Sequence, residues 1–195
     1  MKFDTTYIRI LVINLLKNQM YSAIYQPYKT VIHFLLRFFG VYGGLSFLYF
    51  YYLKAFELQV DPFTVWIGKL SKRIIELFGY KSRILSEPGI PNLQLYINDS
   101  YVARIIEGCN AASILILFAA FIIAFSGKIK SLIRFLVIGI FSISVINILR
   151  IAFLAITLYK FPQHSEWLHQ LVFPAIIYGF TIVLWLIWVI KFSKK

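Results

Sequence analysis

Four long blocks of this sequence contain no charged side chain, and they restrict the possible folds more than any other feature. The blocks are residues 38–53, 108–126, 135–149 and 170–190. A helix that crosses the hydrocarbon core of a membrane needs about 20 mainly apolar residues, because each residue adds about 1.5 Å. The second and fourth blocks have this length. The first reaches it by extending back past Arg37, whose head group can snorkel, and the third by extending through Arg150 to Tyr159.

The composition also separates this chain from soluble domains. Hydrophobic residues make up 60% of it and charged residues 14%, whereas about a quarter of a soluble domain is charged. We therefore predict an all-α integral membrane protein, a bundle of about four transmembrane helices. The predicted spans are residues 34–53, 108–126, 135–159 and 170–190. They belong to one membrane-embedded domain, residues 31–195, which follows a cytoplasmic or interfacial segment, residues 1–30.

The net charge of +12 is compatible with nucleic-acid binding, but its distribution indicates membrane topology instead. Four spans place the N-terminus, residues 127–134 and the C-terminus on one side, which carries eleven Lys and Arg residues and one acid, Asp4. The opposite side, residues 54–107 and 160–169, carries eight Lys and Arg residues against seven acids. Because excess Lys and Arg marks the cytoplasmic side, we predict cytoplasmic termini and an extracytoplasmic insert.

The insert, residues 54–107, has the pattern of a small folded unit. Asp61-Pro62 is a typical helix start, apolar residues then recur every three or four positions, and Gly79 is a suitable stop. This pattern predicts an amphipathic helix on the membrane surface or over the helix bundle.

A short β-hairpin is predicted after that helix. Residues 93–97 and 101–105 alternate apolar and polar side chains on either side of the turn residues Asn98-Asp99. The hairpin would lead directly into Cys109, and it should pack on the helices because a two-stranded hairpin is marginal alone.

Cys109, Arg150 and His169 reach the same membrane level in this topology. Cys109, the chain's single cysteine, begins the second span on its outer side, and His169 directly precedes the fourth span. Arg150 lies sixteen residues beyond the cytoplasmic Arg134, or about 24 Å along a helix. An ionisable residue inside a span usually faces the bundle interior and has a partner there. This convergence is the main indication of a functional site.

Each of these residues also has a purely structural interpretation. Arg150 could snorkel outward near its helix end, and Cys109 could pack as a small apolar side chain. An interfacial histidine such as His169 is ordinary, and His164, five residues earlier, is an alternative if that stretch is a loop. A non-catalytic membrane assembly factor or scaffold is therefore the alternative to an enzyme.

The chemistry of the three residue types fits one reaction. The thiolate is the nucleophilic form of cysteine, and a helix N-terminus or a nearby cation favours it; both are expected beside Cys109. A histidine can exchange protons with the thiol and with a leaving amine, and an arginine can hold the oxyanion of acyl transfer. Supporting candidates are Asn147, one turn before Arg150, Asn110, and Glu107, which either orients the histidine or closes the hairpin. No metal-ligand or phosphate-binding motif appears, so neither a metal nor a cofactor is predicted.

The ordered motifs resemble those of the exosortase/archaeosortase family. They are Gly108-Cys109-Asn110, then Asn147-Ile-Leu-Arg150-Ile on the next span, then His169 in HQLVFP before a last tryptophan-bearing span. The resemblance covers residues 90–190. The short length and the phrase IIEGCNAAS look most like the compact F-type exosortases.

The resemblance implies a membrane-embedded cysteine transpeptidase or protease of the bacterial inner membrane. Its substrates would be exported proteins with a C-terminal sorting signal, which consists of a short motif, a transmembrane helix and a basic tail. Cys109 would form a thioester, Arg150 would stabilise the oxyanion or position the substrate, and His169 would be the acid/base. Membrane lipid and a small membrane protein are further partners to consider, and nucleic acid is not expected.

Overall fold

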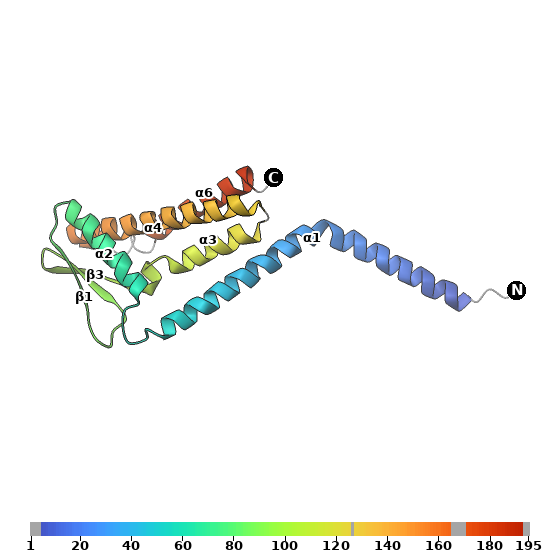
Figure 1. Cartoon of the computed structure of the whole chain (residues 1–195), viewed down its shortest axis with the longest axis horizontal. Helices are drawn as coiled ribbons and strands as arrows, with labels where there is room; N and C mark the ends of the chain where they lie inside the picture. The colour runs from blue at the N-terminus through green and yellow to red at the C-terminus, as the bar shows by residue number, and fades with distance from the viewer. Residues whose placement is uncertain (1–4, 126, 165–170, 193–195) are drawn as a thin grey trace.

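The computed structural model describes residues 5–125, 127–164 and 171–192; for residues 5–27, His164 and Phe173 it describes the backbone alone. The helices are α1 (Thr5–Lys54), α2 (Pro62–Leu77), α3 (Ala112–Ala124), α4 (Ile129–Lys160) and α6 (Phe173–Lys191), with the short 3-10 helices η1 (Glu107–Cys109) and η2 (Pro162–His164). The strands are β1 (Ser82–Ser86), β2 (Leu93–Ile97) and β3 (Ser100–Ile105). α1 packs against α3, and α2 lies with the sheet at one end of α3, α4 and α6 (Figure 1).

In the part of the chain that the structure describes, three helical stretches are long and apolar enough, by length and composition, to cross a membrane: Tyr28–Lys54, Ile129–Lys160 and Pro174–Lys191. α3 is also apolar, but its 13 residues extend over only about 20 Å. α3 begins four residues after the start of the second predicted span, residues 108–126. The first residues of this predicted span form η1 and the turn that follows, where Ala111 has a left-handed backbone with φ 63°. At the other end of the bundle, the backbone of the predicted N-terminal segment continues into the first span as one helix, α1.

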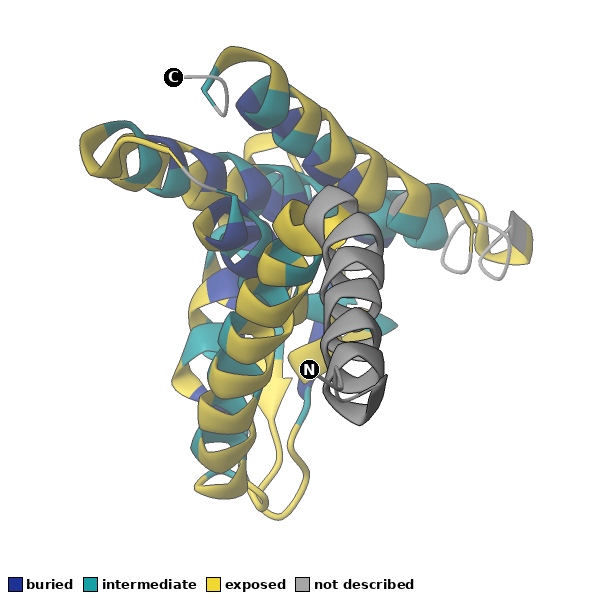
Figure 2. Ribbon diagram, turned by 90° about the vertical axis from the view of Figure 1, so that its right-hand side faces the viewer, coloured by how far each residue is buried: buried dark blue, intermediate teal, exposed yellow. Residues whose placement is uncertain are grey.

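The outward faces of the long helices carry large apolar side chains that the protein itself leaves uncovered. Figure 2 shows these faces as exposed along much of the helices. Examples are Phe39 (63% exposed), Leu48 (66%), Phe141 (70%) and Ile190 (69%). A soluble monomer rarely exposes contiguous apolar surface on this scale, whereas lipid covers it in a membrane. The predicted fold class, a helical integral membrane protein, is confirmed.

The predicted amphipathic helix is α2, and its two ends are built as the sequence indicated. The Oδ1 atom of Asp61 accepts a hydrogen bond from the backbone N–H of Thr64 at 3.0 Å, and Pro62 occupies the first turn. Gly79 follows the last turn with φ 87°, a conformation that glycine adopts without a Cβ clash. α2 packs against α4 and β1, so it lies over the bundle.

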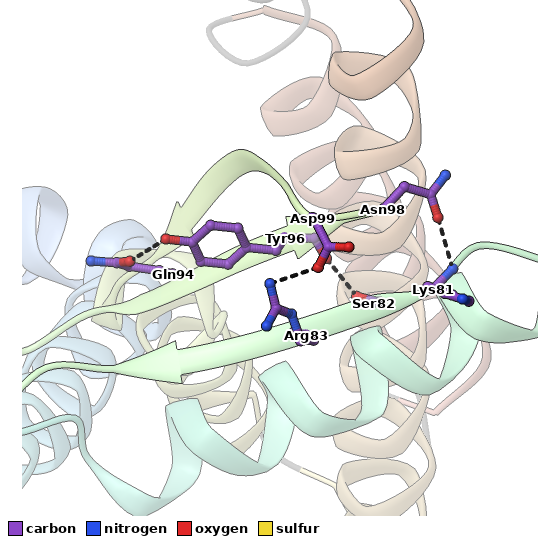
Figure 3. A network of polar contacts seen from close by, with 7 residues as sticks. All are labelled: Lys81, Ser82, Arg83, Gln94, Tyr96, Asn98 and Asp99. Carbon is purple, nitrogen blue, oxygen red and sulfur yellow. Dashed lines mark hydrogen bonds and ion pairs between the residues drawn. The ribbon is translucent and has the colours of Figure 1, made fainter.

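The predicted hairpin is confirmed as β2 and β3, but it belongs to an antiparallel sheet of order β1-β2-β3. The turn residues Asn98 and Asp99 have φ of 47° and 64°, as a two-residue hairpin turn requires. β1 was not predicted. Its exposed residues make polar contacts with the hairpin, including an ion pair of 2.7 Å between Arg83 and Asp99 (Figure 3).

The other face of the sheet forms the first hydrophobic core. Leu93, Leu95 and Ile97 of β2 pack there against α2 and α4. Gly68 of α2 makes this approach close, because a Cβ at this position would lie 2.7 Å from Cδ1 of Leu93. The core therefore fixes the sheet, and with it the start of η1, onto α4.

The second core joins α3, α4 and α6. The ring of Phe118 on α3 is fully buried and lies against Gly139 on α4, where an added Cβ would be 2.2 Å from the ring. Trp188 of α6 is also fully buried, and the centroid of its ring lies 5.1 Å from the ring centroid of Phe135. This packing sets the spacing between α3, which follows Cys109, and α4, which carries Arg150.

Candidate active site

The backbone around Cys109 is held by the side chain of Asn110. This side chain is 1% exposed. Its Nδ2 atom donates to Oγ1 of Thr64 at 2.9 Å and to the hydroxyl of Tyr49 at 3.2 Å. Its Oδ1 atom accepts from the backbone N–H of Ala112 at 2.8 Å, the first residue of α3. Asn110 thus ties the turn to α1 and α2 and pairs with the first backbone N–H of α3, which fixes the backbone next to Cys109.

Two side chains of α4 donate hydrogen bonds to the backbone carbonyl of Cys109. Nδ2 of Asn147 is 2.9 Å from this oxygen, and Nη2 of Arg150 is 3.3 Å from it. Asn147 and Arg150 share a helix face, since they are three residues apart. The carbonyl contacts bring together residues separated by 38 and 41 positions in the chain.

Cys109 and Arg150 line a common cavity of about 230 Å³. Its walls come from the end of β3, from η1, from α4 and from the start of α6. Most of the lining is apolar; the polar contributions include Arg104 and Tyr178. The thiol is half-buried, with one side packed on the first hydrophobic core. Cys109 therefore combines the two environments considered from the sequence: it packs against apolar side chains, and it also lines a cavity.

Two buried polar atoms of this site, one acceptor and one donor, are unpaired among the residues that the structure describes. Oδ1 of Asn147 and Nε of Arg150 are buried and have no hydrogen-bond partner among the described residues. Buried polar atoms are paired in the great majority of cases. Arginine has five N–H donors, so the contact with the Cys109 carbonyl leaves Arg150 further donors for a bound molecule.

Glu107 lies on the other side of η1. Its side chain is exposed and lines a different pocket, together with Glu57 and Asp61. Its backbone carbonyl accepts from the N–H of Asn110 at 3.3 Å. These contacts fit the interpretation that Glu107 closes the turn after the hairpin.

The structure describes the side chain of neither candidate histidine. His169 lies outside the described residues. The backbone of His164 ends η2, just beyond the end of α4, and its side chain is likewise outside the description. Among residues 28–125, 127–163 and 174–192, no three His, Cys, Asp or Glu side chains form a group that could hold a metal ion.

Tyr178 is a site residue that the sequence did not reveal. It is half-exposed on α6, and it lines the same cavity as Arg150. The available signal was one tyrosine inside an apolar span, which is too common to single out. Arg104 also lines this cavity. In the sequence it is one of eight basic residues on the predicted outer side, and nothing distinguishes it from the others.

The fold and the site together define an integral membrane protein with a cysteine, an arginine and two asparagines at one end of a helix bundle. A sequence profile of the transmembrane exosortase family (Exosortase_EpsH) matches residues 30–189, so the chain belongs to this family. The matched range contains Cys109, Asn147 and Arg150 as well as the two candidate histidines, His164 and His169. The family generally consists of cysteine transpeptidases and implies the processing of sorting signals. Searches among curated proteins and among solved structures gave no significant match.

Proposed function

We propose that this protein is a membrane-embedded cysteine transpeptidase or protease that cleaves the C-terminal sorting signal of exported proteins. The observation that carries the proposal is the pair of hydrogen bonds from Asn147 and Arg150 to the Cys109 carbonyl, beside a cavity that Cys109 and Arg150 line. A thiol that served only for packing would need neither a buried cation nor a cavity beside it. The motif around Cys109 also supports assignment to the compact F-type exosortases.

The reaction begins with attack of the Cys109 thiolate on the carbonyl carbon of the scissile peptide bond. A C–S bond forms, and the resulting oxyanion is stabilised by the unused N–H groups of Arg150. When the C–N bond breaks, a protonated histidine gives its proton to the leaving amine. Water or an acceptor amine then attacks the thioester and restores the thiol. We assign the proton transfer to His169, with His164 as the alternative.

The hydrogen bonds to the Cys109 carbonyl have a separate role in this scheme. They fix the backbone of the nucleophile against α4, so that the thiol and the guanidinium keep one relative position. Such preorganisation matters because a displacement of about 1 Å can cost on the order of 100-fold in rate. Asn147 and Asn110 are positioning residues.

The active site is proposed to face outward from a bacterial cytoplasmic membrane, with both termini in the cytoplasm. The support is the charge asymmetry: the excess of Lys and Arg lies on the side of the termini and of residues 127–134. The scissile bond of a sorting signal lies just outside its transmembrane helix, which is the level proposed for Cys109. Because Cys109 is the single cysteine, a small membrane-impermeant methanethiosulfonate should label it in intact spheroplasts. Labelling that required lysis would contradict this orientation.

The test of the function replaces Cys109 with Ala and, separately, with Ser. The protein is co-expressed with an exported protein that ends in a short motif, an apolar helix and a basic tail. We expect the wild type to shorten this protein and both variants to leave it full-length, with normal membrane levels of all forms. Ser113→Ala is the matched control, since Ser113 is exposed and only four residues away. Processing that continued without the thiol would leave a non-catalytic assembly factor or scaffold as the better explanation.

A further inference from the structure

The sheet has a free edge beside the candidate active site. β3 is the last strand in the order β1-β2-β3, and among the described residues it forms ladder pairs with β2 alone. Both edge strands also contact a helix, β1 against α2 and β3 against α4, but no further strand pairs with β3 among the described residues. An edge strand presents a row of unpaired backbone N–H and C=O groups, which can pair with another extended chain.

The free edge continues directly into the nucleophile. β3 ends at Ile105, and Cys109 follows four residues later at the end of η1. Ala103, Arg104 and Ile105 line the same cavity as Cys109. On another side the cavity is bounded by α6. A chain laid along β3 would therefore pass between the sheet and α6 and arrive at the thiol.

We propose that the substrate segment next to the scissile bond binds in an extended conformation, as an additional strand on the edge of β3. This inference rests on the proposed function and adds the mode of substrate recognition to it. Strand addition to a sheet edge obtains affinity from main-chain hydrogen bonds and specificity from pockets for alternate side chains. The mainly apolar lining, which includes Ile151, Leu154 and Ile177, selects an apolar side chain next to the cleaved bond.

The size of the cavity favours an extended segment over a helical one. One turn of an α-helix with side chains, about 10–12 Å wide and 5.4 Å high, occupies roughly 400–600 Å³, which is more than the volume of about 230 Å³ in this cavity. A helical segment would also keep its carbonyl groups in internal hydrogen bonds, whereas the attacked carbonyl must be free. The transmembrane helix of the substrate thus remains in the lipid, and the preceding motif unwinds along β3.

A second copy of this chain is the competing occupant, because free edges also pair with each other. The exposed Arg104 on β3 disfavours such pairing, since charged side chains on an edge strand oppose edge-to-edge association. In two copies paired edge to edge, the arginines of both chains would approach each other. A substrate segment brings no such repulsion unless it is itself basic.

Photo-crosslinking tests the proposal. p-Benzoylphenylalanine is introduced in place of Tyr101, which is 57% exposed on β3, in a Cys109→Ala protein that retains uncleaved substrate. The probe is the same exported protein used in the processing assay. The matched control carries the photo-crosslinker in place of Leu85, which is 46% exposed on β1. Both variants should elute from size exclusion as the parent does; if the Tyr101 variant does not, the exposed Ser100 of β3 replaces it.

We expect irradiation to join the substrate to the β3 position at least tenfold more efficiently than to the β1 position. Equal yields from both strands, or a crosslink from β3 to a second copy of the chain, would overturn the proposal. The wild type is assayed for processing in the same cells. If it processes the substrate while β3 gives no crosslink, docking on β3 is wrong and the peptidase function stands. If processing itself fails, the proposed function fails first.

Discussion

The contact between Gly139 of α4 and Phe118 of α3 allows a quantitative test of the packing that brings Cys109 to Arg150. Replacing Gly139 with Ala adds one methyl group where the ring of Phe118 leaves no room. The new Cβ would lie 2.2 Å from Cζ and 2.5 Å from Cε1 of that ring. Because Phe118 is fully buried, the ring cannot turn away into lipid, and the two helices must separate.

Two opposing terms set the magnitude. Overpacking a buried contact typically costs about 1–3 kcal/mol. Replacing Gly by Ala inside a helix returns about 0.5–1 kcal/mol of backbone entropy. Because the ring leaves no room for the methyl group, the cost lies in the upper half of its range, and the free energy of unfolding should fall by about 1–2.5 kcal/mol, or about 2–10 °C in Tm for a chain of this size. Gly179 of α6 is the matched control, since an added Cβ there would have no atom within 4 Å.

The assay is the loss of monodisperse protein on heating in detergent, followed by size-exclusion chromatography. Gly139→Ala should lower the midpoint, and Gly179→Ala should leave it unchanged or raise it slightly. The pair Gly139→Ala with Phe118→Leu should recover part of the loss, because a smaller side chain makes room for the methyl group. Equal midpoints for the two glycine variants would refute the packing argument. Processing by Gly139→Ala should also fall, since α3 and α4 together hold Cys109 against its donors.

Three further substitutions separate strong contacts from weak ones. Arg150→Lys keeps the charge but loses the planar donor group that reaches the carbonyl of Cys109. Processing should therefore fall at least tenfold, equivalent to ~1.4 kcal/mol, while the amount of the protein in the membrane stays the same. Asn110→Ala removes three hydrogen bonds, two of them buried, and should lower the free energy of unfolding by about 2–3 kcal/mol, measured as a lower detergent midpoint. Asp99→Asn breaks an ion pair between two exposed side chains, Asp99 (80% exposed) and Arg83 (58%). The detergent midpoint should therefore change by less than the equivalent of about 1 kcal/mol. A larger change would mean that the turn depends on this charge.

The proposed mechanism gives Arg150 two roles. Its Nη2 atom donates to the Cys109 carbonyl, and the other N–H groups of this cavity-lining residue stabilise the oxyanion of the substrate. Asn147 shares the first role through its shorter contact of 2.9 Å. The two roles are separable, because Asn147→Leu removes only the positioning contact. A variant with intact thiol labelling but slow processing would show that backbone positioning, and not access to the thiol, limits the reaction.

Local patterns in the sequence determined much of the fold. Long charge-free blocks predict membrane helices because the thickness of a bilayer fixes the required length. Asp61-Pro62 and Gly79 bounded α2, since capping and positive φ are properties of individual residues. The turn at Asn98-Asp99 defined the hairpin for the same reason. The candidate nucleophile also came from sequence, through its motif and its position at the edge of a span.

Tertiary structure alone decided how the site is assembled. The sequence placed Arg150 and Cys109 at one membrane level, but it did not show that the guanidinium binds the carbonyl of Cys109. It gave no sign that Asn110 reaches α1 and α2, or that Tyr178 joins the cavity. These contacts depend on the spacing and rotation of packed helices, which close-fitting positions such as Gly139 set. Periodicity reports which face of a helix is apolar, whereas the partner of that face is chosen only when the whole bundle packs.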